Sequence, residues 1–177
     1  MTSAGPVRRL HDVTRRVLVL GLAVLVAASA AAVAGASGRR LSKTQWTKYT
    51  TANKTWVSTN SKGIATFRTC SQRSRAAKPS QAADVFKSCL DGTVPKLTKA
   101  TQKFGATLHG FQKSVSGDCT QALNVYIGSL YSWTNVINGI NHAVQLGQLP
   151  STANAQTVYN QITSSATAFR KACKPLG

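Results

Sequence analysis

Residues 119–144 read CTQALNVYIGSLYSWTNVINGINHAV, and apolar side chains recur through them at steps of three and four residues. The series comprises Cys119, Leu123, Tyr126, Leu130, Trp133, Ile137, Ile140 and Val144. This spacing places the series along one side of an α-helix, as in the seam of a helical bundle. Asp118 precedes it as a predicted N-cap, and Gln121 completes a capping box three residues later. We therefore expect a helix from Asp118 to about Val144.

The same helix carries further apolar residues that point away from this seam. They are Val125, Ile127, Tyr131, Val136 and Leu146. A helix that is apolar on most sides is usually buried, so we predict a central position in the bundle. The alternative is a neutral docking surface for a partner, a second copy of the chain or an apolar ligand.

Helical spacing also appears on the N-terminal side of this segment. Trp46, Tyr49, Trp56, Ile64 and Phe67 mark the inward face of a first helix. This helix is predicted to begin near Ser42, with Gly63 as a candidate break and 71–78 as a polar, basic turn. A short helix then starts at Ser80, its predicted N-cap, and ends at Asp91.

A third long helix is predicted from Thr93, its capping residue, to Val115. Its seam consists of Val94, Leu97, Thr101, Phe104, Leu108, Phe111 and Val115. A last helix follows from about Val158 to Ala172. Because no segment alternates with a period of two, we expect no strands. The predicted fold class is all-α: a disulfide-stapled bundle of four to five helices in one domain, 37–177, after an N-terminal signal or anchor helix.

Residues 1–36 have the pattern of an export signal. The first part of the segment contains four arginines, Arg8, Arg9, Arg15 and Arg16. An uncharged apolar run from Val17 to Ala36 follows them and ends in small residues. We expect cleavage near residue 34 or 36. The alternative is an uncleaved signal anchor, because an apolar helix of this length spans a bilayer. Either outcome places the rest of the chain outside the cytoplasm, secreted or anchored, with membrane contact only through this segment.

The four cysteines follow the predicted signal, and an even number in an exported chain favours disulfides. Cys119 begins one predicted helix and Cys173 ends the next, so an antiparallel hairpin brings them together. Cys70 and Cys89 lie on either side of one turn. We therefore predict the pairs Cys70–Cys89 and Cys119–Cys173. Because the chain has no C-x-x-C motif, we expect no zinc site, and we expect no other metal or cofactor.

The charge is strongly positive and unevenly distributed. The chain has 22 Lys and Arg but only 4 acidic residues, all Asp, for a net charge of +18. Residues 119–169 contain no charged side chain. Lys96, Lys99 and Lys103 fall within about 60° of one another on their predicted helix, opposite its seam. One interpretation of this stripe of lysines is that it is only a solvated helix face.

A second group of basic residues, Arg73, Arg75 and Lys78, falls in the predicted turn. We predict that these three and the lysine stripe bind anions, because like charges closer than a Debye length add their potentials. The aromatic residues of the first helix are expected in the core, so we expect no sequence-specific nucleic-acid binding. The expected partner is an anionic polymer or lipid surface.

We therefore expect a non-enzymatic binding or structural protein that interacts with anionic envelope or extracellular polymers. The alternative function is a carrier or docking module that uses the uncharged 119–169 hairpin to bind an apolar ligand, a partner or a second copy. We expect no enzyme, because Asp84, Asp91 and Asp118 each have a predicted structural position. His109 and His142 belong to no catalytic motif.

Overall fold

The structure is a computed structural model that describes residues 38–151 and 154–176. Within these ranges the chain is all-helical and has no strand, which confirms the predicted class. The predicted signal or anchor segment lies outside the described residues. The elements are α1 (Lys43–Ala76), the 3-10 helix η1 (Pro79–Gln81), α2 (Ala82–Leu90), α3 (Thr93–His109), the 3-10 helix η2 (Gln112–Ser114), α4 (Asp118–Gln145) and α5 (Ala155–Cys173).

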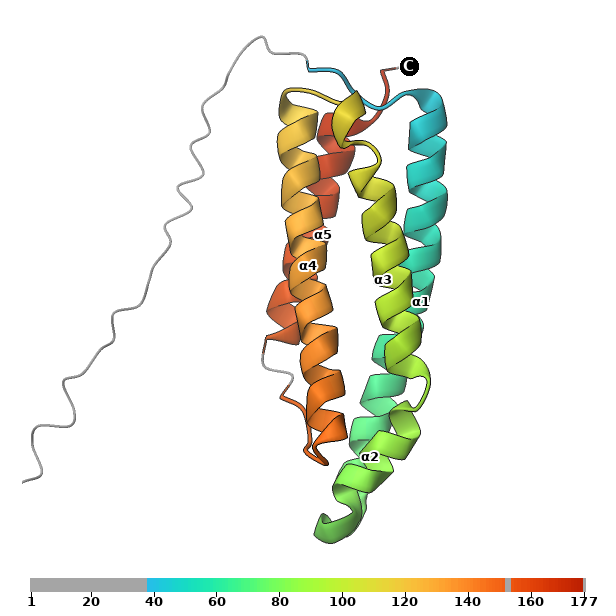
Figure 1. Cartoon of the computed structure of the whole chain (residues 1–177), viewed down its shortest axis with the longest axis vertical. Coiled ribbons are helices and arrows are strands. Elements are labelled where there is room, and N and C mark those ends of the chain that lie inside the picture. Colours follow the sequence, from blue (N-terminus) through green and yellow to red (C-terminus); the bar gives the residue numbers. More distant parts are fainter. Residues whose placement is uncertain (1–37, 152–153, 177) are drawn as a thin grey trace, which may run out of the picture. The chain divides into compact units, whose positions relative to one another are not determined.

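The four longer helices α1, α3, α4 and α5 form an antiparallel bundle, and the short α2 lies in the crossover between α1 and α3 (Figure 1). The start of α1 and the end of α5 meet at one end of this bundle. There the Leu41 backbone N–H donates to the Cys173 carbonyl over 3.2 Å. The predicted helical bundle is therefore confirmed, with α2 as its short fifth helix.

Aromatic rings from all four long helices meet in the core. Tyr49 of α1 packs against Phe169 of α5 with ring centroids 4.9 Å apart. Phe104 of α3 stacks on Trp56 of α1 at 5.3 Å and contacts Tyr126 of α4 at 5.8 Å. Aromatic pairs of this kind stabilise a fold by more than the burial of their apolar area alone. The predicted inward face of the first helix is thus confirmed for Tyr49 and Trp56, which are both buried.

Helix α1 continues through Gly63 to Ala76, so the predicted break and most of the predicted turn at 71–78 are wrong. Gly63 is buried against α3. A Cβ atom at this position would lie 2.5 Å from a methyl carbon of Leu97. The glycine therefore allows α1 to approach α3 closely, and the hydrogen bonds of the surrounding helix outweigh its low helix propensity.

The predicted caps differ from those in the structure. Helix α4 follows Gly117, which has φ 60° and makes no side-chain cap, so the predicted capping box of Asp118 and Gln121 is wrong. A capping box forms instead at the start of α1, between Ser42 and Gln45. Asp118 is the first helical residue, where its charge still favours the helix N-terminus.

Two other predicted helix ends also shift. The N-cap of α3 is Gly92, and α3 ends at His109. The predicted cap at Thr93 and extension to Val115 are therefore wrong, although Phe111 and Val115 remain buried. The short helix begins after η1, and no side-chain cap is found at its start, which corrects the predicted role of Ser80.

Helix α4 does not lie at the centre of the bundle, which corrects our prediction. Its seam is buried as expected from Cys119 to Ile137. Val125 and Tyr131, however, are 56% and 60% exposed. The helix is one of four around a shared core, and its outward side carries exposed but uncharged residues such as Val125 and Tyr131.

Both predicted disulfides are present. Cys70–Cys89 joins α1 to α2 with a Cα–Cα distance of 5.5 Å, and Cys119–Cys173 joins the start of α4 to the end of α5 at 4.8 Å. Cys119 and Cys173 belong to the main core, whereas Cys70 packs with Phe86 and Leu90 in a smaller cluster. The bonds are consistent with an oxidising environment outside the cytoplasm.

We predict that removing the Cys119–Cys173 disulfide destabilises the protein more than removing the Cys70–Cys89 disulfide does. The loops closed by the two bonds span 54 and 19 residues. The chain-entropy relation gives losses of about 4 kcal/mol for C119S/C173S and about 3 kcal/mol for C70S/C89S. Urea unfolding followed by circular dichroism measures both. A larger loss for C70S/C89S would contradict loop closure as the main contribution.

We predict that G63A lowers the free energy of unfolding by about 1–3 kcal/mol, because the added methyl group overpacks the contact with Leu97. The matched control is G128A in α4, where nothing lies within 4 Å of an added Cβ. There the better helix propensity of alanine raises stability by about 0.5–1 kcal/mol. Equal effects of the two substitutions in chemical denaturation would refute the close approach at Gly63.

We predict that the fold is lost in alkali through its buried tyrosines. Burial raises the pKa of the Tyr49 and Tyr126 hydroxyls above the ordinary value of 10.0, and the charge of Arg170 lowers each pKa by less. Above about pH 10 the unfolded chain releases these protons while the folded chain retains them, so stability present below that pH is lost above it. Y126F should reduce the slope of the unfolding free energy against pH by about 1.4 kcal/mol per pH unit.

The control is Y131F, because Tyr131 is exposed. An unchanged slope in Y126F would contradict a contribution of the buried tyrosine to unfolding in alkali.

Candidate anion-binding surface

Every basic side chain of the described residues is exposed. Of the 22 Lys and Arg, four precede residue 38 and the remaining 18 all lie at the surface. Three aspartates accompany them: Asp84 in the first turn of α2, Asp91 at its end and Asp118 at the start of α4. The described surface therefore has a large excess of positive charge.

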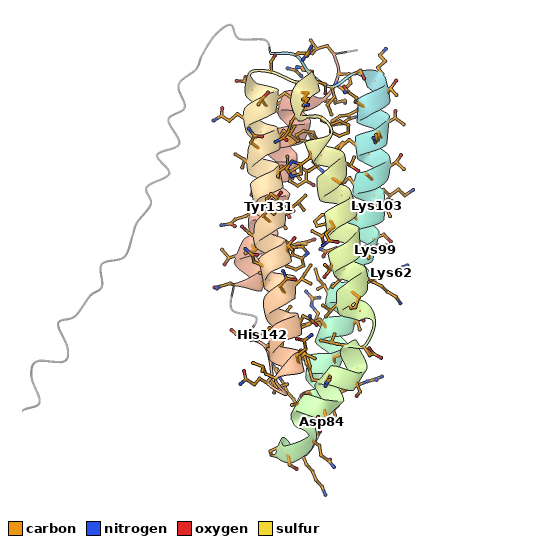
Figure 2. All side chains as sticks on the ribbon, viewed as in Figure 1. Lys62, Asp84, Lys99, Lys103, Tyr131 and His142 are labelled. Atoms are coloured by element: carbon orange, nitrogen blue, oxygen red, sulfur yellow. A yellow bond between two sulfur atoms is a disulfide. The ribbon has the colours of Figure 1, made fainter. Side chains whose placement is uncertain are left out.

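Lys96, Lys99 and Lys103 form the predicted stripe on α3. All three are exposed, and they lie opposite the buried residues Val94 and Phe104. Figure 2 shows Lys99 and Lys103 on the same side of the bundle as Lys62 of α1, away from Tyr131 and His142 on α4. The structure thus keeps the three lysines of α3 together.

Lysines of α1 extend this stripe across the helix–helix seam. Because Gly63 packs on Leu97, the neighbouring residues Lys62 and Lys96 lie at the same level of the bundle. Lys48 lies on the same flank of α1, about 40° from Lys62 around a helix that turns 100° per residue. We call the following five exposed residues the α1/α3 basic surface: Lys48, Lys62, Lys96, Lys99 and Lys103.

No acidic residue opposes this surface from its own helices. Neither α1 nor α3 contains Asp or Glu. Side chains three and four residues apart on a helix stand about 5–6 Å apart, which is less than the Debye length of about 8 Å at physiological salt. The positive potentials of Lys96, Lys99 and Lys103 therefore reinforce one another and attract anions.

The second predicted anion group lies at the C-terminal end of α1 and just beyond it. Arg73 and Arg75 lie in the last turn of α1 rather than in a turn between helices, which corrects the predicted context. Ser74 between them is buried, and its hydroxyl donates to the Ala82 carbonyl over 2.7 Å. The two arginines consequently leave the helix on opposite flanks of Ser74. Lys78 is exposed beyond the helix end.

An open groove of about 710 Å³, which the sequence did not predict, lies between α1 and α3. Its apolar floor contains Ala52, Trp56, Ala100 and Phe104. Lys48 and Lys103 line it together with Thr44, Thr47, Thr51, Thr55 and Thr107. One wall of the groove is formed by α1, and the recurrence of threonine at steps of three and four residues on this helix is the sequence signal for that wall. The other wall is formed by α3, and the sequence pattern does not locate it because it does not show that α3 pairs with α1.

His109 has two neutral partners. His109 lies with Nε2 3.0 Å from the Tyr131 hydroxyl and Nδ1 3.1 Å from Gln112 Oε1. His142 is exposed in the last turn of α4.

In residues 38–151 and 154–176, His, Cys, Asp and Glu form no group of three or more that would suit a metal ion. No helix within these same ranges has the length and apolar character needed to cross a membrane.

The uncharged 119–169 segment forms the α4–α5 hairpin. Its exposed large apolar side chains are Val125, Tyr131, Leu146 and Leu149. None of the residues that line the groove belongs to this hairpin. Val125 and Leu146 lie 21 residues apart, which is about 30 Å along a helix. The exposed apolar side chains are therefore spread along the hairpin.

The chain has no match among known proteins. No protein-family model matches the chain. No curated protein and no solved structure matches it at the significance threshold of the comparison.

Proposed function

We propose that this protein is a non-enzymatic binding protein for anionic polymers or anionic lipid surfaces, and that it acts through the α1/α3 basic surface. The observation that carries the proposal is the row of exposed lysines on two adjacent helices that contain no acidic residue. A solvated helix face alone requires polar side chains, which can be neutral or of mixed charge. The uniform sign of this face favours recognition of a negative partner.

The length of the basic surface favours a polymer or a lipid surface over a small anion. Lys48 and Lys62 lie 14 residues apart on α1, which corresponds to about 21 Å along the helix. A partner with repeated negative groups engages several of these lysines at once and releases several counterions. Such binding is sensitive to salt and tolerant of the exact structure of the polymer.

The proposed location is outside the cytoplasm, at the cell envelope or beyond it. Two disulfides support an oxidising environment. The basic, apolar and small-residue order of 1–36 supports export through a signal peptide or a signal anchor. Anionic polymers and lipid headgroups of the envelope are therefore the proposed partners, and the proposal involves no cofactor.

The alternative function, docking through the 119–169 hairpin, has less support. A carrier needs a cavity for its ligand, and the groove of about 710 Å³ lies between α1 and α3 instead. Apolar side chains exposed singly are normal on soluble proteins. Formation of a dimer through Val125 and Tyr131 would revive the alternative, and sedimentation equilibrium at several concentrations detects it.

We predict that K96Q/K99Q/K103Q weakens binding to inorganic polyphosphate and reduces its salt dependence. If these lysines each neutralise one phosphate, the slope of log K against log salt falls in magnitude by about two to three. Fluorescence anisotropy of labelled polyphosphate at several salt concentrations measures both quantities.

The matched control is K43Q/K54Q/R68Q, which removes the same charge from α1. These three residues lie on the flank of α1 that is turned away from α3, at about 100° per residue. We expect the control to keep most of the salt slope. Equal losses in the two triple variants would show that net charge alone controls binding and would overturn the assignment to this surface.

A further inference from the structure

We propose that the groove between α1 and α3 binds a single-chain anionic amphiphile, such as a fatty-acid carboxylate. The alkyl chain would lie on the floor formed by Ala52, Trp56, Ala100 and Phe104, and the carboxylate would lie beside Lys48. This inference concerns a different class of ligand from the polymers above and does not rest on polymer binding.

The groove has a suitable size and shape. Its volume of about 710 Å³ falls within the range of about 300–1,000 Å³ that is usual for small-molecule sites. The α1 wall extends from Thr44 to Trp56, which is about 18 Å along a helix. An elongated, narrow ligand fits a groove of this form better than a compact ligand does.

The two ends of the groove differ in polarity. Trp56 stacks on Phe104, and Gly63 packs on Leu97, so the antiparallel register places Ala100 and Phe104 beside the Trp56 end of the wall. The apolar lining residues therefore gather at that end. The opposite end is supplied by α1 alone, with Thr44, Thr47, Lys48 and Thr51. A ligand with one apolar and one polar end matches this arrangement.

The threonine hydroxyls divide into two sets. Those of Thr47, Thr55 and Thr107 each donate to a backbone carbonyl over 3.1 Å, one turn earlier in their helix. Their hydrogen atoms are thus engaged, and their methyl groups can contact an alkyl chain. The hydroxyls of Thr44 and Thr51 have no such partner among the described residues.

Thr44, Lys48 and Thr51 recur at steps of four and three, so they lie on one face of α1 within two turns. Two unengaged hydroxyls and one ammonium group are then available as hydrogen-bond donors at the polar end of the groove. A carboxylate accepts several such bonds, and bonds to a charged acceptor are the stronger ones. This donor set favours an anionic headgroup.

Charge complementarity excludes a cationic headgroup. Lys48 and Lys103 line the groove, and both helices lack acidic residues. Lys103 lies on the opposite wall, near the apolar floor, where its methylene stem can cover an alkyl chain while its ammonium stays in water. We therefore expect Lys48 to contribute more than Lys103 to headgroup binding.

Quenching of tryptophan fluorescence by 12-bromododecanoate, at monomeric concentrations, tests the proposal in the full chain. All 3 tryptophans, Trp46, Trp56 and Trp133, lie in the bundle. Residues 1–36 contain no tryptophan. We expect saturable quenching that W56F largely removes, because Trp56 is the tryptophan in the groove floor.

The headgroup assignment is tested with K48Q and the matched control K54Q, a lysine of the same helix that does not line the groove. We expect K48Q to raise the half-saturating concentration about tenfold, as the loss of one bond to a charged group predicts. K54Q should change it less than twofold. The neutral 12-bromododecanol should bind equally to the natural protein and to K48Q.

Three results would overturn the proposal: no saturable quenching of the natural protein, quenching that W56F retains in full, or equal losses in K48Q and K54Q.

Failure of polymer binding and failure of amphiphile binding can be distinguished by experiment. K96Q/K99Q should weaken polyphosphate binding and leave 12-bromododecanoate binding unchanged, because neither lysine lines the groove.

Discussion

Repulsion between like charges is the constraint under which this chain folds. The 18 basic residues of the described ranges face only three aspartates, so ion pairing contributes little to cohesion. Burial of apolar side chains and covalent links must therefore hold the helices together. The core meets this need through rings from four helices, and Cys119–Cys173 ties the α4–α5 hairpin at the end where both termini of the bundle meet. Because this hairpin is uncharged, it adds apolar contact without adding repulsion.

The same constraint explains where the candidate site lies. Basic side chains must remain in water, so α1 and α3 turn their lysines outward on either side of their shared seam. Trp56, Phe104 and the small residues Ala52 and Ala100 form the floor of the groove between these helices. Further along the same two helices, Gly63 lets Leu97 pack directly against the backbone of α1. Charge and shape thus combine on one face, which presents both a cationic surface and an apolar floor.

The sequence predicts the features that depend on helical periodicity. The seam of α4 and the all-α class follow from the spacing of apolar residues. The Cys119–Cys173 pair follows from cysteines at helix ends, and the Cys70–Cys89 pair from cysteines on either side of one turn. The stripe of Lys96, Lys99 and Lys103 follows from the same geometry. These features are local, or need only the knowledge that consecutive helices are antiparallel.

The features that sequence reasoning missed depend on tertiary contacts. Gly63 has the sequence character of a helix break, and only its contact with Leu97 shows why the helix continues. The exposure of Val125 and Tyr131 depends on how many helices surround α4. The groove requires the pairing of α1 with α3. The capping box of Ser42 and Gln45, in contrast, was visible as a serine followed three residues later by glutamine.

The central claim is that anions bind to the face formed by α1 and α3. Nuclear magnetic resonance of the ¹⁵N-labelled protein, titrated with a short polyphosphate, tests it most directly. The account predicts that amide shifts concentrate around Lys48, Lys62, Lys96, Lys99 and Lys103, while residues 119–169 remain nearly unchanged. Shifts centred on the 119–169 hairpin, or spread evenly over every basic residue, would contradict it.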